Sequence, residues 1–199
     1  LSSYESKGSK YFEGRRYNDD IAAGNQGLLL FEKGLDGFKP KRKILLRGNH
    51  EYRIIKAINA DPKLEGLIGY HNFNDVELGW EVVDFLVPIE VDGITYSHYF
   101  QSPGNGRPYS GQIDTILKNV GFSFVAGHQQ GLKISRRELT NGKVHTGIIA
   151  GSFYLHNENY RGPQATNEWR GILVLHEVRD GNYDLMTVSL DFLRRKYGS

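Results

Sequence analysis

The sequence contains no cysteine, which excludes both a disulfide framework and a metal site made of thiolates. It also lacks any apolar run near the roughly 20 residues that a membrane-spanning helix needs, so we expect no membrane partner. An excess of one charge is missing too. The 25 basic and 23 acidic side chains give a formal net charge of +2, which by itself indicates neither a nucleic acid nor an anionic membrane. What is present, 39% hydrophobic and 12% aromatic residues in a chain of 199, is enough to bury a sizeable core.

Helices and strands alternate in the first half of the sequence. An apolar stripe at helical spacing predicts a helix over residues 18–35. The members of this stripe are Ile21, Leu28, Phe31 and Leu35. The apolar run at residues 44–46 shows no alternation, which is typical of a strand buried on both faces. The segment after it turns helical and ends before Pro62.

Antiparallel strands dominate the second half of the sequence. Hairpins are predicted at three turn pairs, Asp92-Gly93, Asn141-Gly142 and Asp180-Gly181. A helix is expected over residues 112–119, and another buried strand in "FSFVAGH", which ends at His128. Because no internal repeat, low-complexity tract or long linker occurs in the sequence, we predict one α/β domain over residues 1–199.

Three of the predicted strands are each followed by a histidine. These are His50, His98 and His128, and Asn49 lies next to the first of them. In open α/β sheets, ligands bind beyond the carboxyl ends of the strands, so these side chains are expected to converge in one crevice. Imidazole nitrogens together with an amide oxygen are a suitable ligand set for Zn, Mn, Fe or Ni. The pattern therefore indicates a metal site.

A structural interpretation of each residue stays open beside the functional one. A histidine at the end of a strand is more often a capped or hydrogen-bonded surface residue than a ligand. Asn49 is also a favoured residue type for the N-cap of the following helix, and the helix dipole accounts for Glu51 in the first turn. Gly48 and Gly127 serve equally well in tight turns between strand and loop. Four polar residues at the ends of three strands, taken together, favour the functional interpretation.

The stretch "LLRGNHE", followed by "YSH" and then "AGH", resembles the calcineurin-like metallophosphoesterase superfamily. The motifs of that family run in the order D-x-H, G-D-x-x-D, G-N-H-[DE], a lone His after a strand, and G-H-x-H. This sequence carries the third motif as residues 48–51 and the fourth as His98. It carries half of the fifth as residues 127–130, where Gln130 replaces the second histidine. The resemblance covers the chain from about residue 40 onward, and "EWRGILVLHEV" looks like the tail of phage and bacterial members.

The resemblance implies a particular α/β fold, the four-layer αββα sandwich of mixed β-sheets found in metallophosphoesterases. Nothing in the sequence matches the motifs D-x-H or G-D-x-x-D. We therefore expect the chain to be the C-terminal portion of a longer protein, so that residues 1–199 form a metallophosphoesterase-like domain that lacks its first strands.

The resemblance also implies a centre of two divalent metal ions, with Mn, Fe, Zn or Ni as candidates, whose bound hydroxide attacks a phosphoester. Asn49, His98 and His128 would all hold one of the ions. His50 would be the catalytic residue that stabilises the phosphoryl group or protonates the leaving oxygen. Gln130 stands where the family has a ligand of the other ion, and an amide oxygen is a weaker donor than an imidazole nitrogen.

Competing functions follow from these motifs. The first is a metal-dependent hydrolase of phosphoesters, either a phosphatase or a phosphodiesterase or nuclease. Its substrate would be a small molecule or a nucleic acid in the cytoplasm of a bacterial or phage-infected host cell, and the 199-residue chain alone would be inactive or weak. The alternative is a catalytically decayed binding module on the same scaffold, with Gln130 as the mark of decay. A third possibility is an accidental resemblance in which the histidines are structural.

Overall fold

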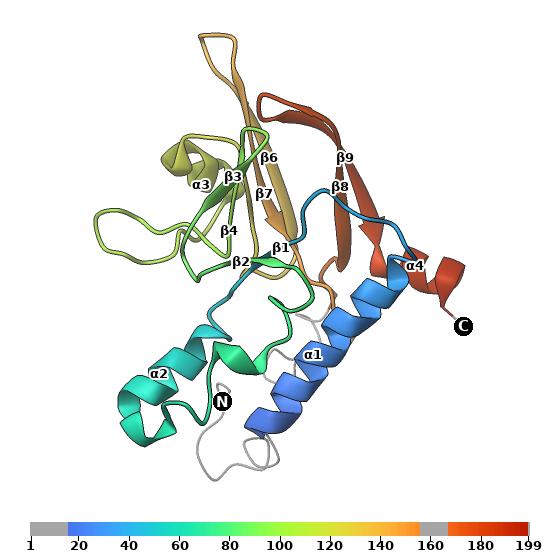
Figure 1. Cartoon of the computed structure of the whole chain (residues 1–199). Coiled ribbons are helices and arrows are strands. Elements are labelled where there is room, and N and C mark those ends of the chain that lie inside the picture. Colours follow the sequence, from blue (N-terminus) through green and yellow to red (C-terminus); the bar gives the residue numbers. More distant parts are fainter. Residues whose placement is uncertain (1–15, 156–166, 199) are drawn as a thin grey trace. The chain divides into compact units, whose positions relative to one another are not determined.

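The computed structural model describes residues 16–155 and 167–198, and the chain divides into two compact units, Leu1–Phe85 and Leu86–Ser199 (Figure 1). Each unit combines helices with β-strands, and parallel strand pairing occurs in both. The predicted α/β class is therefore confirmed, with sheets that include a mixed one. The prediction of a single domain over residues 1–199 stays a prediction.

The first unit joins helices to a pair of parallel strands. Its elements are α1 (Tyr17–Gly34), β1 (Ile44–Leu46), α2 (Tyr52–Ala60), the short 3-10 helices η1 (Pro62–Leu64) and η2 (Tyr70–Asn72), and β2 (Glu81–Val83). Strands β1 and β2 pair in parallel, with Leu45 opposite Val82. Both helices predicted for this part of the sequence are confirmed, and α1 agrees with the predicted range 18–35 to within one residue at each end.

Two details of the first unit differ from the sequence predictions. Phe31, assigned to the inward stripe of α1, is 51% exposed, and its ring packs against Trp80 with 5.2 Å between the centroids. Strand β1, predicted to be buried on both faces, is half-buried along its whole length. Among the described residues, β2 is the one strand bonded to β1.

The second unit is built on a five-stranded sheet. Its elements are β3 (Ile89–Val91), β4 (Ile94–Ser97), α3 (Ile113–Val120), β5 (Phe124–Ala126), β6 (Leu132–Glu138), β7 (Val144–Ala150), β8 (Gly171–Arg179), β9 (Asn182–Ser189) and α4 (Leu190–Tyr197). The strand order in the sheet is β3-β4-β5-β7-β6. Strands β4, β5 and β7 run parallel, while β3 and β6 are antiparallel edge strands. Strands β8 and β9 form a separate antiparallel ribbon.

All three predicted hairpins are present, and two of their turns touch each other. In the turns Asp92-Gly93 and Asp180-Gly181, the φ angles are 52° and 78°, and 51° and 76°, the left-handed conformation of a two-residue hairpin turn. The Gly181 N–H donates a hydrogen bond to the Asp92 carbonyl at 3.1 Å. A Cβ atom on Gly93 would lie 2.6 Å from the Gly181 nitrogen, so the two turns pack backbone against backbone.

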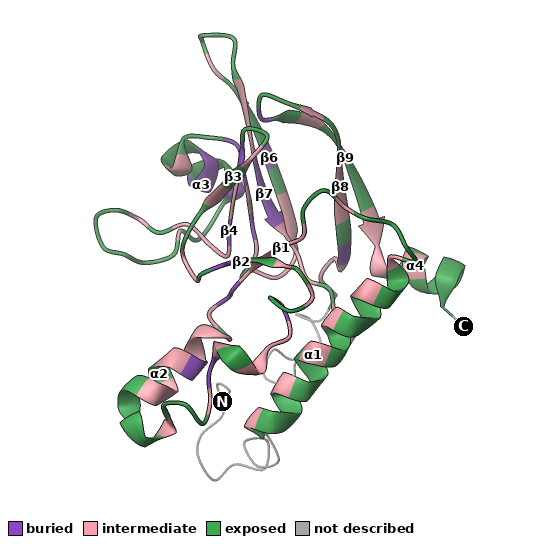
Figure 2. Ribbon diagram, viewed as in Figure 1, coloured by how far each residue is buried: buried purple, intermediate pink, exposed green. Residues whose placement is uncertain are grey.

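The core of the second unit lies between α3 and the parallel strands, where Figure 2 shows buried segments on α3, β4 and β7. The buried cluster consists of Ile113, Ile116, Leu117, Phe124, Ala126 and Ile149. The three α3 residues follow helical spacing, which places them on one face. Phe124 is fully buried, and its ring occupies the space beside Gly147, where a Cβ atom would lie 2.7 Å from Phe124 Cε1. Glycine at this position lets the central strand carry a large aromatic residue.

We therefore predict that Gly147→Ala lowers the free energy of unfolding by about 1–3 kcal/mol, because the added methyl group forces Phe124 out of its place in a well-packed core. Urea unfolding followed by circular dichroism measures this change. Gly27→Ala is the matched control: it lies in α1 with open space around it and should raise stability by up to about 1 kcal/mol. Equal effects of the two substitutions would contradict the packing argument.

Candidate functional site

The C-terminal ends of three adjacent strands meet at one edge of the five-stranded sheet. The register places Ser97 of β4 opposite Ala126 of β5, and Ala126 opposite Ile149 of β7. Because the three strands are parallel, the residues that follow each of them leave the sheet side by side. His98 and His128 are the first side chains after β4 and β5 that can bind a metal or transfer a proton. The sequence predicted that they converge at this edge.

The structure brings His98 and His128 together. His98 Nε2 lies 3.1 Å from His128 Nδ1, and the ring centroids are 5.0 Å apart in an edge-on arrangement. The ring of Tyr99 packs against both imidazoles, with centroids 5.6 Å and 4.9 Å away. Two imidazole nitrogens at this separation either share a hydrogen bond or offer lone pairs to a common partner.

The backbone at His128 is in a conformation that non-glycine residues seldom adopt. Its φ angle is +62°, and the Gln129 N–H donates to the Gly127 carbonyl at 2.7 Å, which closes a tight γ-type turn around His128. A left-handed non-glycine residue in such a turn costs about 1–3 kcal/mol, and strain of this kind is concentrated at functional sites. The turn holds the imidazole against His98 at the edge of the sheet.

The protonation state of His128 follows from its surroundings. One side of His128 reaches solvent, while burial of the other side lowers the pKa of its imidazole from 6.5. Burial also raises the pKa of the Tyr99 phenol above 10.0. At neutral pH, His128 is therefore a neutral imidazole with a lone pair to offer, and Tyr99 is a neutral phenol beside it.

Gln130 and Ser152 add oxygen atoms on the loops near this edge. Gln130 Oε1 and Ser152 Oγ are buried and have no hydrogen-bond partner among the described residues. The sequence predicted Gln130 as a weak metal ligand and missed both Ser152 and Tyr99. Their positions in the sequence could have indicated both residues. Tyr99 directly follows His98, and Ser152 follows Gly151 just after the end of β7.

Asn49 and His50 belong to the first unit, where they lie in the turn between β1 and α2. The proposed role of Asn49 as helix N-cap is wrong, because α2 begins at Tyr52 and its N-cap residue is Glu51. The Glu51 carboxylate accepts a hydrogen bond from the Gly48 N–H at 2.7 Å, so this side chain closes the turn. The convergence of Asn49 and His50 with the other two histidines stays a prediction.

A buried ion pair supports the start of this turn. Arg47 Nη2 lies 2.9 Å from Asp75 Oδ2, and the two side chains are only 5% and 1% exposed. The guanidinium group also stacks on the ring of Tyr70, 3.9 Å from its centroid, and faces Phe73 at 5.3 Å. Arg47 immediately precedes Gly48, so the ion pair fixes the point at which β1 passes into the turn that carries Asn49 and His50.

Comparisons with protein-family models, with curated proteins and with solved structures found no match. Within residues 16–155 and 167–198, no group of three or more His, Cys, Asp or Glu side chains is placed to hold a metal ion. The helices that the structure describes include none that is long and apolar enough to cross a membrane.

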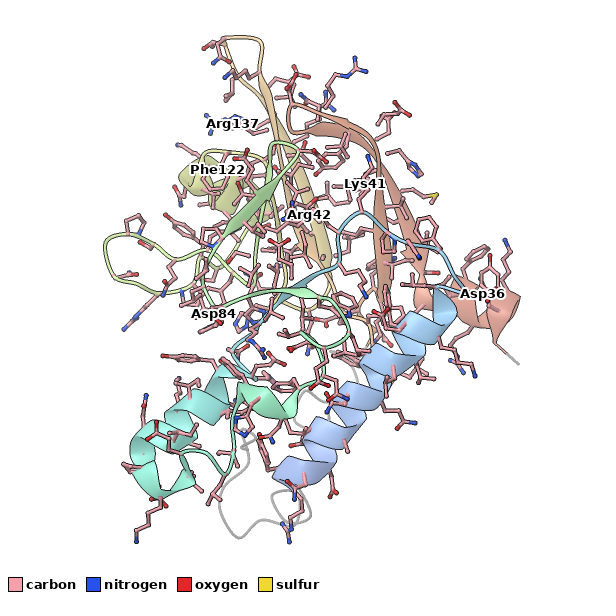
Figure 3. The ribbon with its side chains drawn as sticks, in the orientation of Figure 1. Asp36, Lys41, Arg42, Asp84, Phe122 and Arg137 are labelled. Atoms are coloured by element: carbon pink, nitrogen blue, oxygen red, sulfur yellow. The ribbon has the colours of Figure 1, made fainter. Side chains whose placement is uncertain are left out.

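We predict that Asp75→Ala lowers the free energy of unfolding by about 3–5 kcal/mol, because it leaves the buried Arg47 guanidinium without its counter-charge. Chemical denaturation measures the loss. The matched control is Glu81→Ala, which breaks the exposed ion pair with Arg42 (labelled in Figure 3) and should cost at most about 1 kcal/mol. Comparable losses in the two variants would show that the buried Arg47–Asp75 pair contributes no more to stability than the exposed Arg42–Glu81 pair.

The lowered pKa of His128 predicts a pH dependence of stability. In the window between its folded pKa and 6.5, the unfolded chain binds more protons than the folded chain. The contribution of neutral His128 to the free energy of unfolding is fully present above about pH 6.5. It is lost as the pH falls toward the pKa of His128 in the folded chain. His128→Asn removes the titration and tolerates the positive φ angle. As the pH is lowered from 7.5 to 5.5, we expect the free energy of unfolding to fall more in the wild type than in this variant. An equal pH dependence in the two proteins would contradict a lowered pKa at His128.

Proposed function

We propose that this chain belongs to a metal-dependent hydrolase of phosphoesters, related to the calcineurin-like metallophosphoesterases. The observation that carries the proposal is the meeting of His98 and His128. These residues follow different strands, yet their imidazole nitrogens lie 3.1 Å apart at the C-terminal edge of a parallel sheet. Two histidines in that position are what the motif order G-N-H-[DE], His, G-H-x-H leads one to expect.

The same proposal extends to the fold, as a four-layer αββα sandwich of mixed β-sheets. Its support is limited to the elements present in each unit. In the second unit, α3 covers one face of a mixed sheet whose central strands are parallel. In the first unit, β1 and β2 are parallel strands joined through α2, as in a βαβ connection.

The donor set of the described residues fits divalent metal ions of the proposed kind. The imidazoles of His98 and His128, and the amide oxygens of Asn49 and Gln130, are ligand types that suit Mn, Fe, Zn or Ni. Gln130 Oε1 is buried and has no hydrogen-bond partner among the described residues, so this oxygen is able to accept a metal ion or a hydrogen-bond donor. When bound, such ions polarise a phosphoryl oxygen and acidify a coordinated water.

The roles of the chain's own residues follow from their chemistry. His98 and His128 bind through ring nitrogens, and the lowered pKa of His128 keeps the lone pair of that imidazole available at neutral pH. The resemblance implies Asn49 as a further oxygen ligand of the same ion, and this assignment stays a prediction. His50 hydrogen-bonds to the phosphoryl group or gives a proton to the leaving oxygen, as a general acid does. Tyr99 packs against both metal-binding rings and limits their rotation.

Substitutions of His50 and His98, which are assigned different roles, test this function. We predict that His50→Ala lowers turnover of bis-p-nitrophenyl phosphate or p-nitrophenyl phosphate by about 10²–10⁴-fold in the presence of Mn²⁺, with metal content unchanged. His98→Ala should lower both turnover and bound metal. The assays use the protein expressed from its complete reading frame, and metal is counted by mass spectrometry. Equal loss of metal in both variants would contradict the assignment of His50 as a group that acts on substrate.

A decayed binding module is the second candidate, and Gln130 is the observation in its favour. This amide stands where the family has a histidine. Under this alternative the protein retains metal at His98 and His128 but hydrolyses neither a monoester nor a diester. The turnover assay above therefore separates the two functions.

A further inference from the structure

The side chain of Gln129, directly after His128, forms two hydrogen bonds that have no place in the mechanism described so far. Its Nε2 donates to the Tyr109 carbonyl at 3.1 Å, and its Oε1 accepts from Lys133 Nζ at 2.9 Å. A carbonyl oxygen only accepts and an ammonium group only donates, so these partners allow a single orientation of the amide. The amide therefore joins two segments of the second unit in one fixed arrangement.

Both partners of the amide belong to well-anchored segments. Tyr109 packs against the buried cluster of the second unit, and its N–H donates to the Phe100 carbonyl at 2.9 Å. Lys133 lies in the edge strand β6, opposite the buried Ile149 of β7. The amide of Gln129 is thus held between a loop that packs on the core and a strand of the sheet.

The charge of Lys133 is directed at this amide. Among the described residues, its ammonium group forms no ion pair with a carboxylate. The Asp114 carboxylate, which contacts the same strand, accepts instead from Ser135 Oγ at 2.5 Å. A hydrogen bond from an ionised donor is stronger than one between neutral groups. The half-buried Lys133 therefore fixes Gln129 more firmly than a neutral donor would.

Gln129 also takes part in the backbone turn around His128. Its N–H donates to the Gly127 carbonyl across His128, whose φ angle is +62°. A non-glycine residue keeps such a conformation only where the surrounding structure over-determines it. On one side, Gly127 continues from the buried Ala126 at the end of β5. On the other side, Gln129 is held by both ends of its side-chain amide.

The same turn lies against His98. A Cβ atom on Gly127 would be 3.7 Å from the His98 carbonyl oxygen and 3.8 Å from His98 Nδ1. A displacement of the turn would therefore change the separation of 3.1 Å between His98 Nε2 and His128 Nδ1. The distance between the two imidazoles depends on how firmly the turn is held.

We propose that Gln129 is the positioning residue of the histidine pair, and that Lys133 acts through it. The amide holds the turn, the turn sets the left-handed conformation of His128, and that conformation sets His128 Nδ1 opposite His98 Nε2. The inference rests on the proposed function in one respect, since it takes the two imidazoles as ligands of one ion. It adds a requirement of its own, which is that the pair loses its geometry when the amide contacts are lost.

Electron spin-echo measurements of bound Cu²⁺ test this requirement, because they count the imidazoles on an ion that binds imidazole tightly. The protein is expressed from its complete reading frame. We expect His98→Ala and Gln129→Met each to show one coordinated imidazole fewer than the wild type, since methionine is similar in length to glutamine but forms neither hydrogen bond. The matched control Gln112→Met changes an exposed glutamine that forms no side-chain cap hydrogen bond, and should keep the number of the wild type.

Substitutions of Lys133 give a second test, in which charge and position predict opposite results. By charge alone, Lys133→Met removes a cation close to a divalent ion and should tighten metal binding. A positioning role predicts instead that Lys133→Met weakens Mn²⁺ binding by about tenfold, as the loss of an outer-shell contact does. Lys133→Arg keeps a charged donor for the amide and should retain the affinity of the wild type. Isothermal titration calorimetry with Mn²⁺ measures these affinities.

Circular dichroism of each variant identifies a chain that fails to fold, and the Lys133 variants keep the test decisive if Gln129→Met is such a chain. An unchanged number of imidazoles in folded Gln129→Met, or unchanged or tighter Mn²⁺ binding by Lys133→Met, would overturn the positioning role. No loss of an imidazole in His98→Ala would overturn it too, because the pair would then not bind one ion. A wild-type protein that coordinates both imidazoles but hydrolyses neither p-nitrophenyl ester would overturn the proposed function alone.

Discussion

The parallel alignment of β4, β5 and β7 is the constraint on which the candidate site depends. Strands that run in the same direction and share a register end at the same edge, so the loops that follow them are brought together whatever their length. The alignment in turn rests on the core beneath it, where Phe124 of the middle strand packs against α3 and fills the space left by Gly147. Ligand geometry at the edge and packing in the core are therefore coupled, and a change of volume near Phe124 would be felt at His98 and His128.

The two units bury their interiors by different means. The second unit relies on aliphatic and aromatic contacts, which tolerate small changes of angle. The first unit places an arginine and an aspartate at its centre and surrounds the guanidinium with aromatic faces. A charged hydrogen bond has directional requirements that an aliphatic contact lacks, so this centre fixes an orientation as well as a distance. That property matters here because the chain passes directly from Arg47 into the turn of Asn49 and His50.

Local features of this structure could be predicted from the sequence, and features that depend on distant partners could not. The Asp-Gly and Asn-Gly pairs determined their hairpins because the turn conformation is a property of two residues. The apolar stripe of α1 was visible in the sequence, but the contact of Phe31 with the distant Trp80 was not. The convergence of His98 and His128 followed from strand ends and motif order. The positive φ of His128 and the N-cap at Glu51 come with short local hydrogen bonds, within residues 127–129 and 48–51, which the residue types alone did not indicate.

The contact between the turns of Gly93 and Gly181 has a consequence for the route by which the second unit folds. It joins backbone atoms about 90 residues apart in sequence, so it forms only after a large loop has closed. The hairpins themselves are local and assemble quickly. The β8–β9 ribbon can therefore form early as an independent element, while its docking against the β3–β4 turn waits for the sheet. Such a late step leaves the ribbon's strand edges exposed during folding, and these edges are where association between unfinished chains would begin.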